Sequence, residues 1–320
     1  MSKTRILVLH YSQSGQLTRA AKSFMAPLEA RADVEVVWQD IQPRTPYPFP
    51  WGFFSFLDAF PESVYLDGPE IAPVRFDPDT RFDLVVLAYQ VWFLSPSLPI
   101  AGFLKSPAAR VLRDTPVVTL IACRNMWLSA HEKVQKQLAA QGARLIDNVV
   151  LIDQGPAWAT FVTTPRWLLT GKKDAFWFFP PAGVSAADIE GAGRFGRALG
   201  QALPRVKTGA SLLQGLGAVK VLPGYIAGER IAHRSFMIWG RLIRAVGKPG
   251  AIARRAVLLV YLVFLIGMIL TVLPLSMFLR ALARPFIRAR LAREVERLEQ
   301  PSGSSTARID EFLSDEPSRA

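Results

Sequence analysis

The sequence predicts a doubly wound α/β domain with a five-stranded parallel sheet, followed by a mainly helical C-terminal region. Three observations predict this architecture. Short apolar runs alternate with segments of helical periodicity over residues 1–203. The excess of positive charge begins only after residue 203. The longest apolar stretch of the chain, residues 256–279, contains no charged residue.

Five apolar runs are the predicted strands, and they occupy residues 4–9, 34–38, 83–89, 116–122 and 144–152. Segments 16–30 and 128–141, and the stretch from the capping residue Ser185 to Leu203, have the periodicity of helices. The glycines of GAGRFG (191–196) lie inside that last helix, which predicts close helix packing and not nucleotide binding. Because ligands of such sheets bind at the carboxyl ends of the strands, we expect functional residues in the loops that follow them.

The composition excludes several classes of protein. Half of the 320 residues are apolar and 20 % are charged, which excludes a disordered chain. The single cysteine, Cys123, excludes an intramolecular disulfide, and with only three histidines in the chain no metal site is expected. A reducing compartment is the simplest interpretation. The apolar run near the N-terminus is too short for a signal peptide, so none is expected.

The positive charge is concentrated beside the apolar stretch. Residues 1–203 carry 20 basic and 18 acidic side chains, whereas residues 204–300 carry 16 basic and four acidic ones. As one helix, residues 256–279 would be about 36 Å long, which is enough to cross a bilayer. We therefore predict a membrane segment, with a buried core helix as the alternative. A single crossing and a bent helix, broken near Pro274, that enters and returns are both open.

The segments around this run complete the predicted organisation. Residues 204–255 form a basic, membrane-proximal region whose helix, over residues 225–246, lies on anionic lipid or is an ordinary surface helix. Residues 280–300 form a basic juxtamembrane helix, and residues 301–320 form a disordered tail. Nucleic acid is not an expected partner, because the charge borders an apolar span.

Three loops after predicted strands carry the chemical signals. The first, SQSGQLT (12–18), enters a helix, so its N–H groups and hydroxyls predict a phosphate site. It lacks the Gly-Lys-Ser/Thr of a Walker loop and the glycines of a dinucleotide fingerprint. The second, YQVWFLSPSLP (89–99), offers aromatic side chains that can stack on a flat ring, and the third is CRNMW (123–127). Together they describe a pocket for a planar cofactor that carries a phosphate.

These loops resemble those of the flavodoxin-like family of FMN proteins over residues 3–203. YSQSGQLT resembles the family's phosphate loop, and VWFLSPSLP resembles the Trp-Phe loop beside the isoalloxazine ring of flavodoxin-like quinone reductases. The resemblance implies FMN as the cofactor. Two positions depart from the family pattern, because Leu17 stands where a threonine is expected and His10 where an aromatic is expected. These departures concern the detailed phosphate contacts.

The resemblance also implies a set of site residues. It assigns the phosphate to Ser12, Gln13, Ser14, Gly15, Gln16 and Thr18. It assigns the borders of the ring to Gln90, Trp92, Phe93, Cys123, Arg124 and Asn125. Arg124 and Asn125 are the candidate catalytic residues, and Arg124 would stabilise negative charge on the flavin edge or on a substrate enolate.

A closer resemblance is to the flavodoxin-like proteins associated with dialkylresorcinol and aryl polyene-type biosynthesis, through HYSQSGQLT, PYPFPW, YQVWFLSPSLPI, CRNMW and RWLLTGKK. It implies a membrane-anchored FMN oxidoreductase that oxidises a lipophilic cyclic dione to a resorcinol. Thioester condensation is not supported, because Cys123 has no evident histidine partner. The alternatives are an NAD(P)H:quinone reductase, a membrane-tethered electron carrier and a scaffold that has lost FMN.

Two aromatic segments favour a large apolar substrate. Residues 43–78 form an insertion with eight of the 24 prolines and many aromatic side chains, which predicts a lid or a satellite core packed on the sheet. Residues 156–181 are similarly aromatic. A lipophilic small molecule and membrane lipids are the expected partners; a homodimer and an NAD(P)H or protein redox partner stay open. We expect the α/β domain on the cytoplasmic side of a bacterial-type inner membrane.

Overall fold

The computed structural model describes residues 3–313 of the chain. Its strands are β1 (Thr4–His10), β2 (Val34–Asp40), β3 (Leu84–Trp92), β4 (Ser95–Pro96), β5 (Pro116–Cys123) and β6 (Arg144–Ile152). Five of them pair in parallel in the order β2-β1-β3-β5-β6, and the two-residue β4 pairs antiparallel with β3. This is the strand order of the flavodoxin-like fold. The predicted doubly wound, five-stranded parallel sheet is confirmed.

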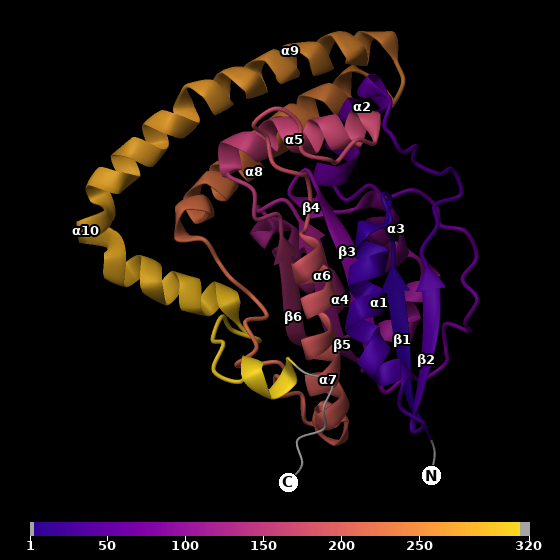
Figure 1. Ribbon diagram of the computed structural model, residues 1–320. Coiled ribbons are helices and arrows are strands. Elements are labelled where there is room, and N and C mark those ends of the chain that lie inside the picture. Colours follow the sequence, from indigo (N-terminus) through magenta and orange to yellow (C-terminus); the bar gives the residue numbers. More distant parts are fainter. Residues whose placement is uncertain (1–2, 314–320) are drawn as a thin grey trace.

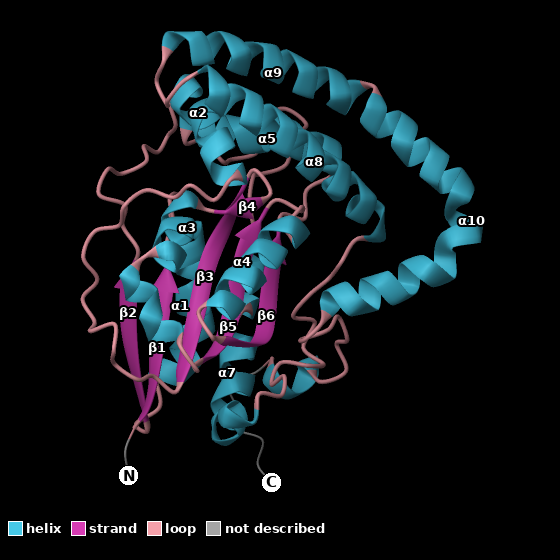
Figure 2. Cartoon of the chain, turned by 180° about the vertical axis from the view of Figure 1, so that it is seen from behind, coloured by secondary structure: helices cyan, strands magenta, loops and turns pink. Residues whose placement is uncertain are grey.

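Helices cover both faces of this sheet (Figures 1 and 2). They are α1 (Gln16–Glu29), α3 (Leu98–Lys105), α4 (Leu128–Ala140), α6 (Ala186–Gly191) and α7 (Gly193–Ala202), with 3-10 turns at Pro107–Leu112 and Leu203–Thr208. Helices α1, α6 and α7 lie on one face, and α3 and α4 lie on the other. The central strands are buried on both faces, and this explains why they are continuous apolar runs in the sequence.

Glycine allows the close approach of α7 to α1. A Cβ atom at Gly196 would lie 1.9 Å from the carbonyl oxygen of Phe24 on α1, so only glycine fits there. The ring of Phe195 stacks on that of Phe24, with 6.3 Å between the ring centroids. Gly196 of GAGRFG therefore serves helix packing, as predicted, whereas Gly191 and Gly193 lie where α6 ends and α7 begins.

The α/β domain continues beyond the predicted boundary at residue 203. Residues 209–221 run beside β6, where the N–H of Val150 donates to the carbonyl of Ala218 over 2.9 Å. Leu212, Leu213 and Val219 are buried in the main core. The fully buried carboxylate of Asp147 accepts hydrogen bonds from the backbone N–H groups of Leu212 and Leu213. A boundary set by the change in charge fell too early, because these apolar residues complete the same core.

Three helices lie over the carboxyl edge of the sheet (Figure 1). They are α2 (Phe53–Val64), α5 (Ala157–Thr170) and α8 (Pro223–Val246). Helix α2 belongs to the 43–78 insertion and packs against α8. Trp51 and Ala59 of the insertion form a small separate core with Leu98. The insertion is thus packed as a satellite core, the second of the two predicted alternatives.

The apolar stretch is not one helix. Helix α9 (Ile252–Leu270) and helix α10 (Val272–Glu299) meet at Thr271, where φ is −116° and ψ is −63°. The break lies close to Pro274, where the bent-helix alternative puts it. Together the two helices form an arch that leaves the domain beside α2 and α8 and returns to it near β6 (Figures 1 and 2). Within the described part of the chain, α9 alone is long and apolar enough to cross a membrane.

The segment after α10 corrects the prediction of a disordered tail. Residues 301–313 pack on the α/β domain, with Ser302 and Phe312 buried and a 3-10 turn at Ile309–Phe312. The hydroxyl of Ser302 donates to Asp147 and accepts from the N–H of Asn148, each over 2.7 Å. Composition alone suggested disorder because the polar residues of PSGSST find their partners only in distant segments. Residues 314–320 lie outside the described part.

Candidate functional site

The loop between β1 and α1 presents hydrogen-bond donors at the carboxyl edge of the sheet. Gly15 has φ 77°, a left-handed conformation that favours glycine, and α1 begins at the next residue. Within residues 3–313 no side chain caps this helix, and its first turn has no acidic residue. The first N–H groups of α1 and the positive end of its dipole therefore point into the loop.

Ser12 adds a donor of its own to this loop. Its hydroxyl oxygen is buried and has no hydrogen-bond partner among the described residues. A buried hydroxyl without a partner costs free energy unless a ligand or water satisfies it. Together with the uncapped start of α1, this hydroxyl is suited to an anionic group such as a phosphate.

Gln16 has a different place from the one predicted. Its side-chain amide is buried and bonds both to the carbonyl and to the N–H of Val184, each over 3.1 Å. The adjacent Gly183 is held by Asp153, which follows β6. Gln16 therefore ties the start of α1 to the segment before α6, and its backbone N–H is the group that it can offer to a phosphate.

Gln13 joins the loop to the insertion and to β3. Its backbone N–H donates to the side chain of Gln90 over 3.4 Å, and its amide donates to the carbonyl of Pro48 over 2.8 Å. The indole N–H of Trp51 donates to Oε1 of Gln13 over 2.8 Å. Three predicted regions thus meet at this one residue. Trp51 was not among the predicted site residues, because only long-range pairing brings it there.

Aromatic rings from three segments pack together beside Gln13. We define the aromatic cluster as Tyr11, Tyr47, Trp51 and Trp92. The ring centroid of Trp92 lies 5.8 Å from that of Tyr11, 5.2 Å from that of Tyr47 and 5.3 Å from that of Trp51. Burial raises the pKa of Tyr47 to about 12, so its phenol stays protonated at neutral pH. Tyr11 and Trp51 are buried, whereas Tyr47 and Trp92 are half-buried and keep ring surface next to the phosphate-type loop.

Phe93 lies at a tight hairpin turn between β3 and β4. Phe93 and Leu94 are the two turn residues, and both are left-handed, with φ of 48° and 59°. Such turns favour asparagine and glycine, so bulky residues here hold strain. The ring of Phe93 packs against Phe56 and Phe60 of α2. Trp92 therefore contacts the aromatic cluster, while Phe93 fastens the turn to α2.

Arg124 follows β5 and stacks on α5. Its guanidinium carbon lies 3.9 Å from the centre of the Phe161 ring. Its Nε is buried without a hydrogen-bond partner among the described residues, and burial lowers the pKa of the guanidinium. Asp153 follows β6 and donates its N–H to the carbonyls of Cys123 and Arg124. The loop is thus fixed in place while one N–H of Arg124 stays free for a further acceptor.

The other predicted residues make few contacts. Ser14, Thr18 and Asn125 are half-buried and make no side-chain hydrogen bond within residues 3–313. Burial raises the pKa of the half-buried Cys123 thiol, which disfavours the thiolate that a nucleophile needs. His131 pairs with the hydroxyl of Tyr89 over 3.4 Å and not with Cys123. Among the described residues, no cluster of side chains could hold a metal ion.

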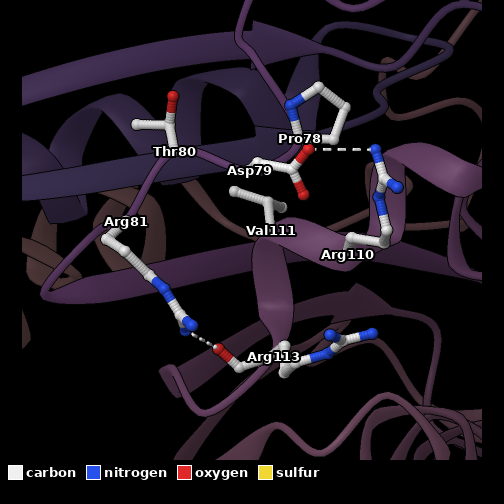
Figure 3. Close-up of a pocket in the computed structure, with 7 residues that line it drawn as sticks. All are labelled: Pro78, Asp79, Thr80, Arg81, Arg110, Val111 and Arg113. Atoms are coloured by element: carbon white, nitrogen blue, oxygen red, sulfur yellow. Dashed lines mark hydrogen bonds and ion pairs between the residues drawn. The ribbon is translucent and has the colours of Figure 1, made fainter.

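A polar hollow lies at the opposite edge of the sheet (Figure 3). It is lined by residues that precede β3 and β5, among them Asp79, Arg81, Arg110 and Arg113. Arg110 forms an ion pair with Asp79 over 3.2 Å, and Arg81 donates to the carbonyl of Arg113. These exposed groups already have partners, and ligands of this fold bind at the other edge. The hollow therefore does not compete with the candidate site.

No protein-family model matches the sequence, and no curated protein matches it significantly. Among solved structures, a flavoprotein in complex with FMN from Lactobacillus acidophilus NCFM shares 19 % identity at a TM-score of 0.37, over 46 % of this chain and 93 % of that one.

Two further structures are similar at lower identity. A flavodoxin from the domain Archaea shares 10 % identity at a TM-score of 0.34, over 62 % of this chain and 99 % of that one. A flavodoxin, WrbA-like protein from Agrobacterium tumefaciens shares 10 % identity at a TM-score of 0.36, over 63 % of this chain and 99 % of that one.

Proposed function

We propose that the protein binds FMN at the carboxyl edge of its sheet and catalyses a redox reaction on a lipophilic ring substrate. One observation carries the FMN proposal. The buried, unpartnered hydroxyl of Ser12 and the uncapped start of α1 lie in the same loop as Gln13, which bonds Trp51 of the aromatic cluster. A phosphate site and flat aromatic surfaces are thereby held side by side, as a flavin mononucleotide requires.

Each part of the site has a role in this proposal. The N–H groups at the start of α1 and the Ser12 hydroxyl bind the phosphate. Trp92 and the strained turn at Phe93 position the ring, and bound FMN supplies a two-electron acceptor or donor. Arg124, whose Nε is free, stabilises negative charge on the ring or on a substrate enolate, and Asn125 of the same loop positions the substrate.

We propose that the substrate is a cyclic dione, which is oxidised to a resorcinol as in dialkylresorcinol-type biosynthesis. A quinone is the alternative substrate. The helices over the site are rich in apolar side chains, and the exposed rings of Phe54 and Trp158 lie on α2 and α5. An apolar roof suits a lipophilic ring better than it suits a protein electron partner. Profiling the lipids and pigments of a deletion strain tests this, and an unchanged profile would contradict it.

FMN binding is tested on the full chain purified in detergent. We expect a yellow protein whose flavin is released by denaturation. Ser12→Ala should weaken FMN binding about tenfold, because a hydrogen bond to a charged phosphate is lost. The matched control is Ser55→Ala, since Ser55 is exposed and bonds only the carbonyl of Gly52. Binding that is equal in both variants, or a protein that takes up no FMN, would refute the proposal.

A further inference from the structure

Both ends of the apolar arch are fastened to the same α/β domain. At the start of α9, the buried guanidinium of Arg254 forms ion pairs with Asp58 and Glu62 of α2. Its Nε lies 2.6 Å from the carboxylate of Asp58, and its Nη1 lies 3.0 Å from that of Glu62. Breaking a buried charge network of this kind is costly, so the start of α9 is held on α2.

The end of α10 is also held on the α/β domain. Leu291, Val295 and Leu298 pack against the main core of the sheet. The buried carboxylate of Glu299 accepts a hydrogen bond from the N–H of Val221 over 3.0 Å. Ser302 then reaches Asp147 at β6. The chain has therefore returned to the domain from which α9 departed.

Between these two anchors the arch exposes apolar side chains. Val260, Val263, Ile266 and Leu270 of α9 are 48–72 % exposed. Leu275, just after the break, is 58 % exposed. We call residues 256–275 the apolar arm; its Leu258 and Tyr261 are buried against α2 and α8, so its free surface is the opposite face. An exposed apolar surface of this size is unfavourable in water and indicates a partner that is itself apolar.

Backbone hydrogen bonds continue across the bend at Thr271. The N–H of Thr271 donates to the carbonyl of Gly267 over 3.0 Å, and the N–H of Leu275 donates to the carbonyl of Thr271 over 3.3 Å. The Thr271 hydroxyl also donates to Gly267. A helix that bends in this way can enter hydrocarbon, where unpaired backbone groups would be costly.

Positive charge surrounds the arm. Arg234, Arg241 and Lys248 precede it, and Arg288 and Arg290 follow it; all five side chains are exposed. Of the four acidic residues in 204–300, Glu229 and Glu299 are buried, Glu294 pairs with Arg230, and Glu296 alone is exposed and makes no ion pair within the described part of the chain, against five exposed basic side chains. The surface around the apolar arm is therefore cationic, which matches the headgroups of anionic lipids.

We propose that the apolar arm inserts into an anionic bilayer from one side and that the chain returns to that same side without crossing. A single crossing would place Arg254 and Leu291 on opposite sides of about 30 Å of hydrocarbon. Both residues pack on one folded domain, which cannot lie on both sides of the bilayer. A single crossing is therefore incompatible with these contacts. This inference concerns topology and does not rest on FMN binding.

Insertion is tested by flotation of the purified full chain with vesicles of phosphatidylglycerol and phosphatidylcholine. The triple variant Val263→Glu, Ile266→Glu, Leu270→Glu should lose more than about tenfold in vesicle binding, because charge is costly in hydrocarbon. Leu313→Glu is the matched control, since Leu313 is 58 % exposed but lies far from the arm in the chain. Equal binding of both variants would overturn the proposal, as would a chain that dimerises through the arm and ignores vesicles.

Sidedness is tested in sealed membrane vesicles with a membrane-impermeant maleimide. Ser55→Cys precedes the arm and Arg290→Cys follows it, and both positions are exposed. Cys123→Ser serves as the background for both variants. We expect both cysteines to react from the same side of the membrane. Labelling from opposite sides would overturn the proposal, and flavin content, measured in parallel on the native chain, reports separately on the proposed function.

Discussion

His131 shows how one buried side chain couples stability to pH. Its ring is 4 % exposed, contacts the edge of Trp127 and pairs with the hydroxyl of Tyr89. Burial lowers its pKa from the ordinary 6.5 to about 4, because the charged form loses its hydration. His131 is therefore protonated at a lower pH in the folded protein than in the unfolded chain.

The resulting stability change has a defined direction. The contribution of neutral His131 to the free energy of unfolding is fully present above pH 6.5 and is lost as the pH falls toward 4. Within that window, the free energy of unfolding of the native protein should fall by up to about 1.4 kcal/mol per pH unit relative to His131→Leu. Urea unfolding of both proteins at pH 7, 6 and 5 measures this difference. Parallel curves for the two proteins would show that His131 does not titrate as described.

Single residues also show which contacts the sequence does not predict. Ser12, Gly15 and Trp92 are recognisable as site candidates because the first two lie in the loop after β1 and Trp92 ends β3, and the fold places those positions at one edge. Gln16 was assigned to the phosphate, whereas its amide bonds Val184, a partner that is 168 positions away. Pairings over such distances depend on the completed fold and leave no local pattern.

At the scale of elements, the contact between α1 and α7 tests the role assigned to Gly196. Gly196→Ala should lower the free energy of unfolding by about 1–3 kcal/mol or more, because its Cβ would collide with the Phe24 carbonyl. Gly200→Ala on the same helix is the matched control, since its Cβ would meet only side-chain atoms at 3.5–3.7 Å. Urea midpoints measure both. Equal effects would mean that helix propensity, and not the close approach, governs this position.

The elements themselves differ in how far the sequence determines them. All five parallel strands appear where apolar runs predict them, because burial on both faces demands such runs. The hairpin at Phe93 and Leu94 could not be predicted, since bulky residues rarely take left-handed turn conformations. The break at Thr271 lies near Pro274, where the bent-helix alternative puts it. The anchors at Arg254 and Glu299 hold the two ends of the arch, and neither contact has a local signal.

At the scale of the whole molecule, Ser302 and Asp147 join the returning C-terminal segment to the sheet. Ser302→Ala should cost about 1–3 kcal/mol, because the buried Asp147 loses a donor and the N–H of Asn148 loses its acceptor. Ser305→Ala is the control, since that hydroxyl only accepts a local hydrogen bond from Ala307 over 3.3 Å. Thermal unfolding distinguishes the two. No difference between these variants would contradict a structural role for the returning segment.

Helix α2 is shared by the candidate site and the arch. Its carboxylates Asp58 and Glu62 hold Arg254, while Phe60 stacks on Tyr261 of α9, with ring centroids 4.4 Å apart, and also contacts Phe93. Helix α2 therefore contacts both α9 and the turn beside Trp92, and a shift of α9 would act on that turn through α2. By thermodynamic linkage, any ligand that favours one position of α2 must favour the matching position of the arch, and the reverse holds equally. Under the two proposals, an effect of bound lipid on the affinity for FMN would be matched by an equal effect of bound FMN on the affinity for lipid.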